Sequence, residues 1–326
     1  MIFERKFRMR YPPVVIILCT YNGEKYIKEQ LDTILEQTYP NIILSVYDDG
    51  SRDRTLEIIE RIKRERQIDD ERLTVHINEK PTGSACANFM QAIKRNQDAA
   101  YIALCDQDDL WQPNKIETMM GCALENDQQG TVPFLVCHGA ERIDASGEPI
   151  GTIHIPELNF FRLVQHPTVQ GSCMLFNRKC TELICFDVVK IAMHDWYISL
   201  VYSLENRIHV IDQPLMKYRI HGNNVNGHRG TGLLTRAKWL VADQEKVAFR
   251  KEALEQLYEV SRHYDNPFLA EYRDAFEKKD EDEIVLLLER YHCLDSGIRS
   301  VVQKRENRKA FRLIQTEKTL NHKGLS

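Results

Sequence analysis

Three acidic side chains and one amide lie together at residues 106–109, where the sequence reads Asp-Gln-Asp-Asp directly after the apolar run 101–105. Carboxylates crowded at the end of a buried strand repel one another, so they need a cation or several hydrogen-bond donors to stay ionised. A divalent ion held by one or two carboxylates and by substrate phosphates meets this need, and it neutralises charge on a departing diphosphate. A solvated turn before Pro113 is the structural alternative. The position after a buried strand favours a site for Mg²⁺ or Mn²⁺.

A second acidic pair, Asp48 and Asp49, ends the next predicted strand along the sheet edge. A carboxylate at this place can accept the N3–H of uracil or thymine, or a ribose hydroxyl, and we assign that role to Asp48. Asp-Gly-Ser is also a favoured turn sequence, so Asp49 is expected to shape the turn. The aromatic Tyr21, which follows the first predicted strand, can stack on the base or pack as a partly buried residue at the strand end.

Two later segments carry side chains that can act in a group transfer, on an acceptor hydroxyl or on a diphosphate leaving group. Asp195 begins an apolar helical stretch, where it can take a proton from an acceptor hydroxyl as a general base or simply cap the helix. Arg219 and His221 follow a predicted strand, where they can stabilise a diphosphate leaving group or belong to a surface loop. From the residues alone, both interpretations stay open for both segments.

A regular alternation of strands and helices is expected to position these side chains. The apolar run at 14–18 is rich in β-branched residues and predicts a strand buried on both faces, and further strands are predicted at 42–47, 73–77 and 101–105. Apolar residues at helical spacing fill the intervals, and this alternation predicts an α/β fold with an open, mostly parallel twisted sheet and crossover helices. Ligands bind beyond the carboxyl ends of such strands, so the acidic clusters are expected to share one site.

The pattern is less regular after residue 130 and becomes mainly helical near the C-terminus. Further strands are predicted at 134–137, 171–176, 208–211 and 215–220, and a Gly- and Asn-rich break at 222–232 marks the predicted domain boundary. The expected organisation is an N-terminal extension (1–12), a catalytic domain (13–225) with a nucleotide-binding half (13–110) and an acceptor-binding half (111–225), and a helical C-terminal region (226–326).

Composition and missing motifs exclude several classes of protein. The 326 residues carry a net charge of −4, without the basic excess of a nucleic-acid binder. Neither G-x-G-x-x-G nor G-x-x-x-x-G-K-[ST] occurs, which argues against dinucleotide and P-loop sites. The nine cysteines form no C-x-x-C pair, so reduced thiols and no zinc are expected.

The absence of a long apolar stretch near the N-terminus predicts a cytoplasmic protein. Residues 299–326 carry eight Lys or Arg against two Asp or Glu. This basic excess leaves open a peripheral contact with the cytoplasmic face of an anionic membrane. A solvated helical face, or one that forms a homo-oligomer, is the alternative.

Taken together, the motifs resemble the family 2 glycosyltransferases, which adopt the GT-A fold. The matching stretches are 19–24, 47–55 and 105–109. Within the family, residues 171–178, 194–196 and 218–224 are most similar to the rhamnosyltransferase-like members, which build O-antigen or capsule chains from dTDP-rhamnose or a related donor. The sequence departs from the family pattern at Cys19, where Pro is frequent, and at His194, where Glu is frequent.

The resemblance implies a role for each matching residue. Asp108 would bind the metal together with His221, Asp106 would lie near the ribose, and Asp195 would be the catalytic base. Nucleotide contacts would come from Thr20, Tyr21, Asn22, Glu24 and Asp48, and diphosphate or acceptor contacts from Asp109, Trp196 and Arg219. The implied reaction is an inverting, single-step transfer of rhamnose or a related hexose from a dTDP- or UDP-sugar to a saccharide or lipid-linked saccharide.

Two other functions remain open at this stage. A sugar-phosphate nucleotidyltransferase would share the open sheet and the metal, but it would normally carry a basic, Gly-rich loop after the first strand. Here that loop is 21–24, with only Lys25 nearby. The second alternative is a catalytically inactive module that binds a nucleotide-sugar.

Overall fold

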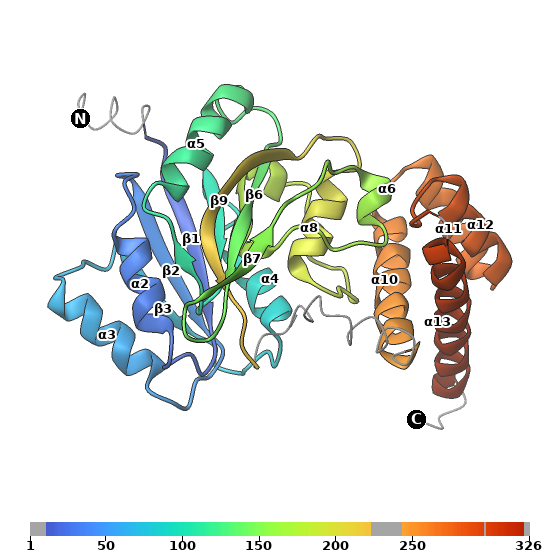
Figure 1. Cartoon of the computed structure of the whole chain (residues 1–326), viewed down its shortest axis with the longest axis horizontal. Coiled ribbons are helices and arrows are strands. Elements are labelled where there is room, and N and C mark those ends of the chain that lie inside the picture. Colours follow the sequence, from blue (N-terminus) through green and yellow to red (C-terminus); the bar gives the residue numbers. More distant parts are fainter. Residues whose placement is uncertain (1–10, 223–242, 297, 323–326) are drawn as a thin grey trace. The chain divides into compact units, whose positions relative to one another are not determined.

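The computed structural model of the chain describes residues 11–222, 243–296 and 298–322 (Figure 1). The chain divides into two compact units, and the domain bounds expected from the sequence stay a prediction. The first unit comprises residues 1–157, 168–186 and 205–227, and the second comprises 158–167, 187–204 and 228–326. The predicted boundary at residue 225, most of the 222–232 break and residues 226–242 of the predicted helical region lie outside the described residues.

A mixed β-sheet forms the first unit, with the order β3-β2-β1-β4-β8-β6-β9-β5 among the described residues and β7 paired to β6. The strands are β1 (Val14–Thr20), β2 (Ile42–Asp48), β3 (Leu73–Ile77), β4 (Tyr101–Cys105), β5 (Leu110–Trp111), β6 (Leu135–Ile143), β7 (Pro149–Ile153), β8 (Met174–Asn177) and β9 (His209–Arg219). Strands β1 to β4 pair in parallel, whereas β8 runs antiparallel to both β4 and β6. The predicted α/β class is confirmed, and the parallel strands β1 to β4 fall within residues 13–110, which the sequence analysis assigned to a nucleotide-binding half.

Strand β1 is the centre of this half because it pairs with β2 on one side and β4 on the other. All seven of its residues are buried, which explains why its sequence is continuously apolar instead of alternating. Full burial of a side chain such as Ile16 or Leu18 contributes about 1.5–3 kcal/mol. The register places Thr20 beside Asp48, so β1 and β2 end at the same edge of the sheet.

The crossover helices follow the predicted pattern. They are α2 (Ile27–Leu35), α3 (Thr55–Glu65) and α4 (Ala85–Arg95), and a further helix, α5 (Lys115–Asn126), follows β5. Each buries one stripe of side chains; in α2 this stripe includes Ile27, Leu31 and Ile34.

The second half of the sheet differs from the sequence prediction in two places. Residues 208–211 and 215–220 were expected to form two strands, but they belong to the single strand β9. Its register against β6 shifts so that Gly139 pairs with Pro214, and Pro214 lacks the N–H that an unbroken ladder would use. The start of the predicted strand 171–176 is instead a 3₁₀ turn, η1 (Gly171–Cys173), ahead of β8.

Helices form most of the described part of the second unit. They are α6 (Phe160–Leu163), α8 (His194–Tyr202), α10 (Asp243–His263), α11 (Pro267–Glu277), α12 (Glu281–Arg290) and α13 (Ile298–His322). None of the helices within the described ranges combines the length and apolar character that crossing a membrane requires.

Buried polar contacts explain why residues 158–167 group with these helices. Gln165 is fully buried, and both its backbone oxygen and its Oε1 accept hydrogen bonds from Nη1 of Arg250 on α10, at 2.9 and 3.0 Å. Nδ2 of Asn307 on α13 donates to the same Oε1 at 3.2 Å. Buried polar groups need such partners, so this segment joins the helical unit although the sequence analysis placed it in the acceptor-binding half.

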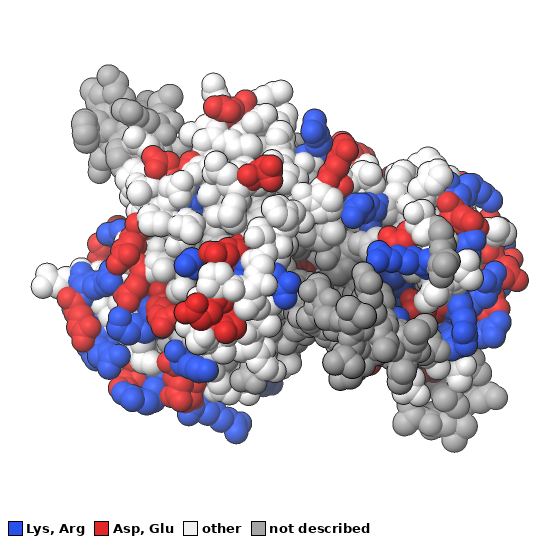
Figure 2. All heavy atoms as spheres, in the orientation of Figure 1, with Lys and Arg blue, Asp and Glu red and all other residues white. Residues whose placement is uncertain are grey.

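Ion pairs occupy part of the basic surface of α13. Arg308 pairs with Asp282 at 2.9 Å, and Arg312 pairs with Glu281. Figure 2 shows positive and negative side chains interspersed over the described surface of these helices. The excess of basic residues in the sequence is therefore partly neutralised within the unit.

Candidate active site

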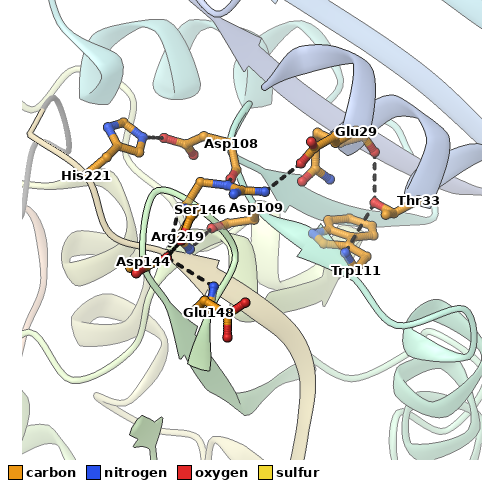
Figure 3. A network of polar contacts seen from close by, with 11 residues as sticks. Glu29, Thr33, Asp108, Asp109, Trp111, Asp144, Ser146, Glu148, Arg219 and His221 are labelled. Carbon is orange, nitrogen blue, oxygen red and sulfur yellow. Dashed lines mark hydrogen bonds and ion pairs between the residues drawn. The ribbon is translucent and has the colours of Figure 1, made fainter. Parts of the chain in front are cut away.

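The acidic segment 106–109 leaves the carboxyl end of β4 and meets the residues that follow β9. Oδ2 of Asp108 lies 2.7 Å from Nε2 of His221, although the two residues are 113 positions apart in sequence (Figure 3). Both side chains are largely buried, at 14% and 13% exposure. The imidazole stacks on the ring of Tyr26, with 5.0 Å between the ring centroids. The structure thus brings together the two residues predicted to bind a metal ion.

Arg219, the last residue of β9, donates hydrogen bonds to the acidic segment 106–109. Its backbone N–H donates to Oδ1 of Asp109 at 3.1 Å, and its Nε donates to the backbone oxygen of Asp108 at 3.0 Å. Nη2 donates to Glu29 of α2 at 2.7 Å, and the guanidinium lies 4.6 Å from the centroid of the Tyr26 ring. The side chain is only 4% exposed. These contacts give Arg219 a role in shaping the site, and the predicted diphosphate contact stays a prediction.

Asp109 points into the interior of the first unit and is 1% exposed. Burial raises the pKa of Asp109 well above its ordinary value, and the nearby carboxylates of Asp108 and Asp106 add to this effect. The hydrogen bond from the Arg219 amide acts in the opposite direction. A buried carboxyl group of this kind supports the loop from inside, and the diphosphate or acceptor contact predicted for Asp109 stays a prediction.

Lys115, at the start of α5, is a buried charged residue that the sequence analysis did not single out. Its side chain is fully buried, its Nζ donates to the backbone oxygen of Ser172 at 2.5 Å, and Nζ lies 3.6 Å from the centroid of the Trp111 ring. Burial lowers the pKa of Lys115 to about 8, and neighbouring thiols and carboxylates offset part of the effect. The signal in the sequence is its position four residues before the buried Met119, on the apolar face of α5.

The carboxylate of Asp48 is enclosed by the turn that follows β2. Oδ1 accepts hydrogen bonds from the amides of Gly50 (3.0 Å) and Ser51 (2.8 Å), and Oδ2 accepts from the hydroxyls of Thr20 (2.8 Å) and Ser51 (2.5 Å). Asp48 is 0% exposed. It therefore ties the ends of β1 and β2 together, and its predicted contact with the nucleotide base stays a prediction.

Asp49 joins the same turn to the loop before α4. Its carboxylate accepts hydrogen bonds from Nδ2 of Asn78 and from the amides of Thr82 and Gly83, at 2.9, 2.7 and 3.0 Å. Burial raises the pKa of Asp49, but these hydrogen bonds outweigh it and leave the pKa below its ordinary value. The expectation that Asp49 serves the turn agrees with these contacts.

The loop after β1 is held by side chains from other elements at four successive residues. The backbone amides of residues 21–24 each donate to a side-chain oxygen at 2.7–3.0 Å. In chain order the acceptors belong to Gln107, Ser51, Thr55 and Asp53. The side-chain oxygens of Asn22 and Glu24 in turn accept the amides of Arg52 and Arg54. The backbone is thus fixed, while the Tyr21 side chain remains 55% exposed.

Asp195 and Trp196 belong to the second unit. Asp195 lies in the first turn of α8, is 8% exposed and accepts the amide hydrogen of Trp196 through Oδ1 at 2.7 Å. Trp196 is 1% exposed and stacks on Phe249 of α10, with 5.4 Å between the ring centroids. This burial places Trp196 in the core of its unit, and its predicted acceptor contact stays a prediction.

Asp108 and His221, the residues predicted to bind a metal ion, fit only a site in which the substrate supplies further ligands to the ion. Across the described ranges, no group of three or more His, Cys, Asp or Glu side chains converges as metal ligands must. Asp108 and His221 supply one carboxylate and one imidazole nitrogen. Such a pair suits a divalent ion whose remaining ligands are substrate phosphates and water.

A sheet with acidic loops at the carboxyl ends of its parallel strands, followed by a helical region, defines a GT-A type glycosyltransferase. Residues 15–184 match the family described as glycosyl transferase family 2. The chain therefore belongs to glycosyltransferase family 2.

Several curated relatives and solved structures are similar over most of the chain. The dTDP-rhamnosyl transferase RfbG of Shigella flexneri is 28% identical over 257 residues, which are 71% of this chain and 83% of RfbG. The Escherichia coli UDP-Glc:alpha-D-GlcNAc-diphosphoundecaprenol beta-1,3-glucosyltransferase WfgD is 26% identical over 220 residues, 66% of this chain and 80% of WfgD.

Among solved structures, S. aureus TarS 1-349 in complex with UDP has a TM-score of 0.56 at 15% identity, covering 95% of this chain and 92% of the TarS 1-349 chain. The mannosyltransferase PcManGT from Pyrobaculum calidifontis, in complex with GDP-Man and Mn²⁺, has a TM-score of 0.51 at 15% identity, covering 98% and 93%. At this level of identity the two structures show a shared fold.

Proposed function

We propose that this glycosyltransferase transfers rhamnose or a related hexose from a dTDP- or UDP-sugar to a hydroxyl of a saccharide or lipid-linked saccharide, during synthesis of a cell-surface polysaccharide. One observation carries the proposal: the loops after β1, β2 and β4 meet at one sheet edge, where Asp108 lies 2.7 Å from His221. The names of RfbG and WfgD, which state a dTDP-rhamnosyl and a UDP-glucosyl donor, support the donor class.

The donor would lie along this edge. Asp108 and His221 would hold Mg²⁺ or Mn²⁺, which when bound neutralises charge on the leaving diphosphate. The exposed ring of Tyr21 would stack on the pyrimidine, because its backbone is fixed and its face is open. Asp106 would contact the ribose, and Asp48, together with Thr20, would set the position of the base.

Asp195 would act as the general base on the acceptor. Its carboxylate takes the proton of the acceptor hydroxyl while that oxygen forms a bond to the anomeric carbon. The bond from the anomeric carbon to the diphosphate oxygen breaks in the same step, and the configuration inverts. A lipid-linked acceptor would bring the enzyme to the cytoplasmic face of a membrane, where the exposed Arg299 and Arg305 can meet anionic lipid.

The test begins with a screen of nucleotide-sugars. The protein is incubated with dTDP-rhamnose, UDP-glucose and related donors, with and without MnCl₂, and released dTDP or UDP is measured. We expect release from one donor class that depends on the metal ion. Nucleotide binding without turnover of any donor or acceptor would favour the inactive module, and diphosphate release from a nucleoside triphosphate and a sugar phosphate would identify a nucleotidyltransferase.

The role of Asp195 is tested with Asp195→Asn. We expect transfer to fall by about 10³-fold, since a general base contributes 10²–10⁴-fold, while nucleotide affinity stays within about twofold of wild type. Asp265→Asn, at an exposed position of the same unit, is the matched control. Near-normal turnover in Asp195→Asn would show that Asp195 is not the base.

A further inference from the structure

We infer that Gln107 is a positioning residue for the donor, which couples the Tyr21 loop to the acidic segment. This inference rests on the proposed function, since it concerns the same donor site. Neither the motif nor the predicted roles assigned any task to the residue between Asp106 and Asp108.

The amide of Gln107 forms two hydrogen bonds with one residue of the neighbouring loop. Oε1 accepts the backbone N–H of Tyr21 at 2.9 Å, and Nε2 donates to the backbone oxygen of Tyr21 at 3.0 Å. A side-chain amide that bonds to both the N–H and the C=O of one residue holds that backbone in place. The hydrogen bonds from a neighbouring β-strand do the same. Both polar atoms of the Gln107 side chain are thus bonded to the Tyr21 backbone.

The two hydrogen bonds between Gln107 and the Tyr21 backbone, here called the clamp, join the loop after β1 to the acidic segment 106–109. The other three amides of the loop 21–24 are held by side chains of residues 51–55, which follow β2. Gln107 alone among these four acceptors belongs to the segment that carries Asp108. The clamp therefore sets the distance between the ring that would stack on the base and the carboxylate that would hold the metal and diphosphate. A nucleoside diphosphate has a limited span, so its binding depends on that distance.

Gly23 provides a second way to open the clamp. A Cβ built on Gly23 would lie 2.3 Å from Oε1 of Gln107, far inside normal contact. Gly23 does not have a positive φ, so alanine can adopt its backbone conformation. The obstructing atom is the end of a flexible side chain, and Gly23→Ala should push the Gln107 amide aside while the loop backbone stays in place.

Four proteins test the inference: wild type, Gln107→Ala, Gly23→Ala and the double variant. Calorimetry measures the Kd for UDP and for dTDP with MnCl₂ present. We expect each single variant to raise the Kd about tenfold, as the loss of two hydrogen bonds predicts, and the double variant to raise it about tenfold as well. Independent effects would multiply to about a hundredfold. Gln97→Ala, an exposed glutamine in the same unit, is the control and should bind as wild type does.

The outcomes separate this inference from the proposed function. Wild-type affinity in Gln107→Ala, or a hundredfold loss in the double variant, would overturn the positioning role and leave the donor site standing. Failure of the wild-type chain to bind either nucleotide would overturn the proposed function and the positioning role together. Thermal unfolding of all four proteins distinguishes positioning from folding, because a clamp on a surface loop should leave the melting temperature nearly unchanged while the Kd rises.

Discussion

Oδ2 of Asp108 and Nε2 of His221 lie 2.7 Å apart, although one follows β4 and the other follows β9. The contact is possible because β9 pairs with β5, the strand directly after the acidic segment, and Arg219 at the end of β9 donates hydrogen bonds to Asp108 and Asp109. Stacking on Tyr26 fixes the plane of the imidazole. A carboxylate and an imidazole held in this way can exchange their mutual hydrogen bond for a shared cation.

Removing either partner should therefore remove the effect of the metal ion on nucleotide binding. In Asp108→Ala and in His221→Ala, we expect Mn²⁺-dependent binding of UDP to weaken at least about 30-fold, equivalent to roughly 2 kcal/mol. Calorimetry with MnCl₂ and with EDTA measures the difference. Glu125→Gln, an exposed position on α5, serves as the control. If UDP affinity in both variants responds to Mn²⁺ as in wild type, the metal does not bind at this pair.

The turn around Asp48 should be sensitive to substitution in its folding as well as in its binding. Asp48→Ala leaves the amides of Gly50 and Ser51 and the hydroxyl of Thr20 without their acceptor in a buried place. We expect the free energy of unfolding to fall by about 3 kcal/mol, with a smaller loss in Asp48→Asn, which keeps one acceptor oxygen. Urea denaturation measures both. An unchanged urea midpoint in Asp48→Ala would contradict the structural role given to this carboxylate.

Lys115 should give the protein a pH dependence of stability in the alkaline range. Its folded-state pKa of about 8 lies below the ordinary value of 10.5, so the native state binds the Lys115 proton less tightly than the unfolded chain does. The unfolded chain then binds more protons between these two values, and wild-type stability rises with pH across this window. The cost of the buried charge is fully present below pH 8 and disappears as the pH approaches 10.5.

The comparison with Lys115→Met isolates this contribution, since other titrating groups affect both proteins alike. From pH 7.5 to pH 10.5 we expect the unfolding free energy of wild type to increase relative to the variant by about 3 kcal/mol. Urea denaturation under reducing conditions at several pH values measures the difference. A difference between the two proteins that does not change with pH would mean that Lys115 keeps an ordinary pKa in the fold.

Local sequence patterns determined the first half of the fold. The continuous apolar run at 14–18 predicted β1 as a strand buried on both faces, and strands were also predicted at 42–47, 73–77 and 101–105; β1 to β4 are all present and pair in parallel. A parallel strand covered on both faces must be apolar throughout, which makes it visible within a short window of sequence. Because the polar clusters follow those strands directly, their common edge was predictable too.

The second half depended on contacts between distant residues. Pro214 interrupts the apolar pattern of β9, so two strands were predicted where the register shift opposite Gly139 permits one. The grouping of 158–167 with the C-terminal helices results from the buried partners of Gln165, which no local pattern indicates.

The sequence by itself determined which residue types gather at the sheet edge: the acidic pairs, the exposed aromatic and the motifs of the family. Only the tertiary structure decided which partners each of these side chains has within the protein. Arg219 and Asp109 have the chemistry of ligand contacts, yet both are directed inward, and Gln107 proved to hold the backbone of Tyr21. The reason is that a side chain's type sets what it can bind, whereas its burial and its partners across the fold set what it does bind.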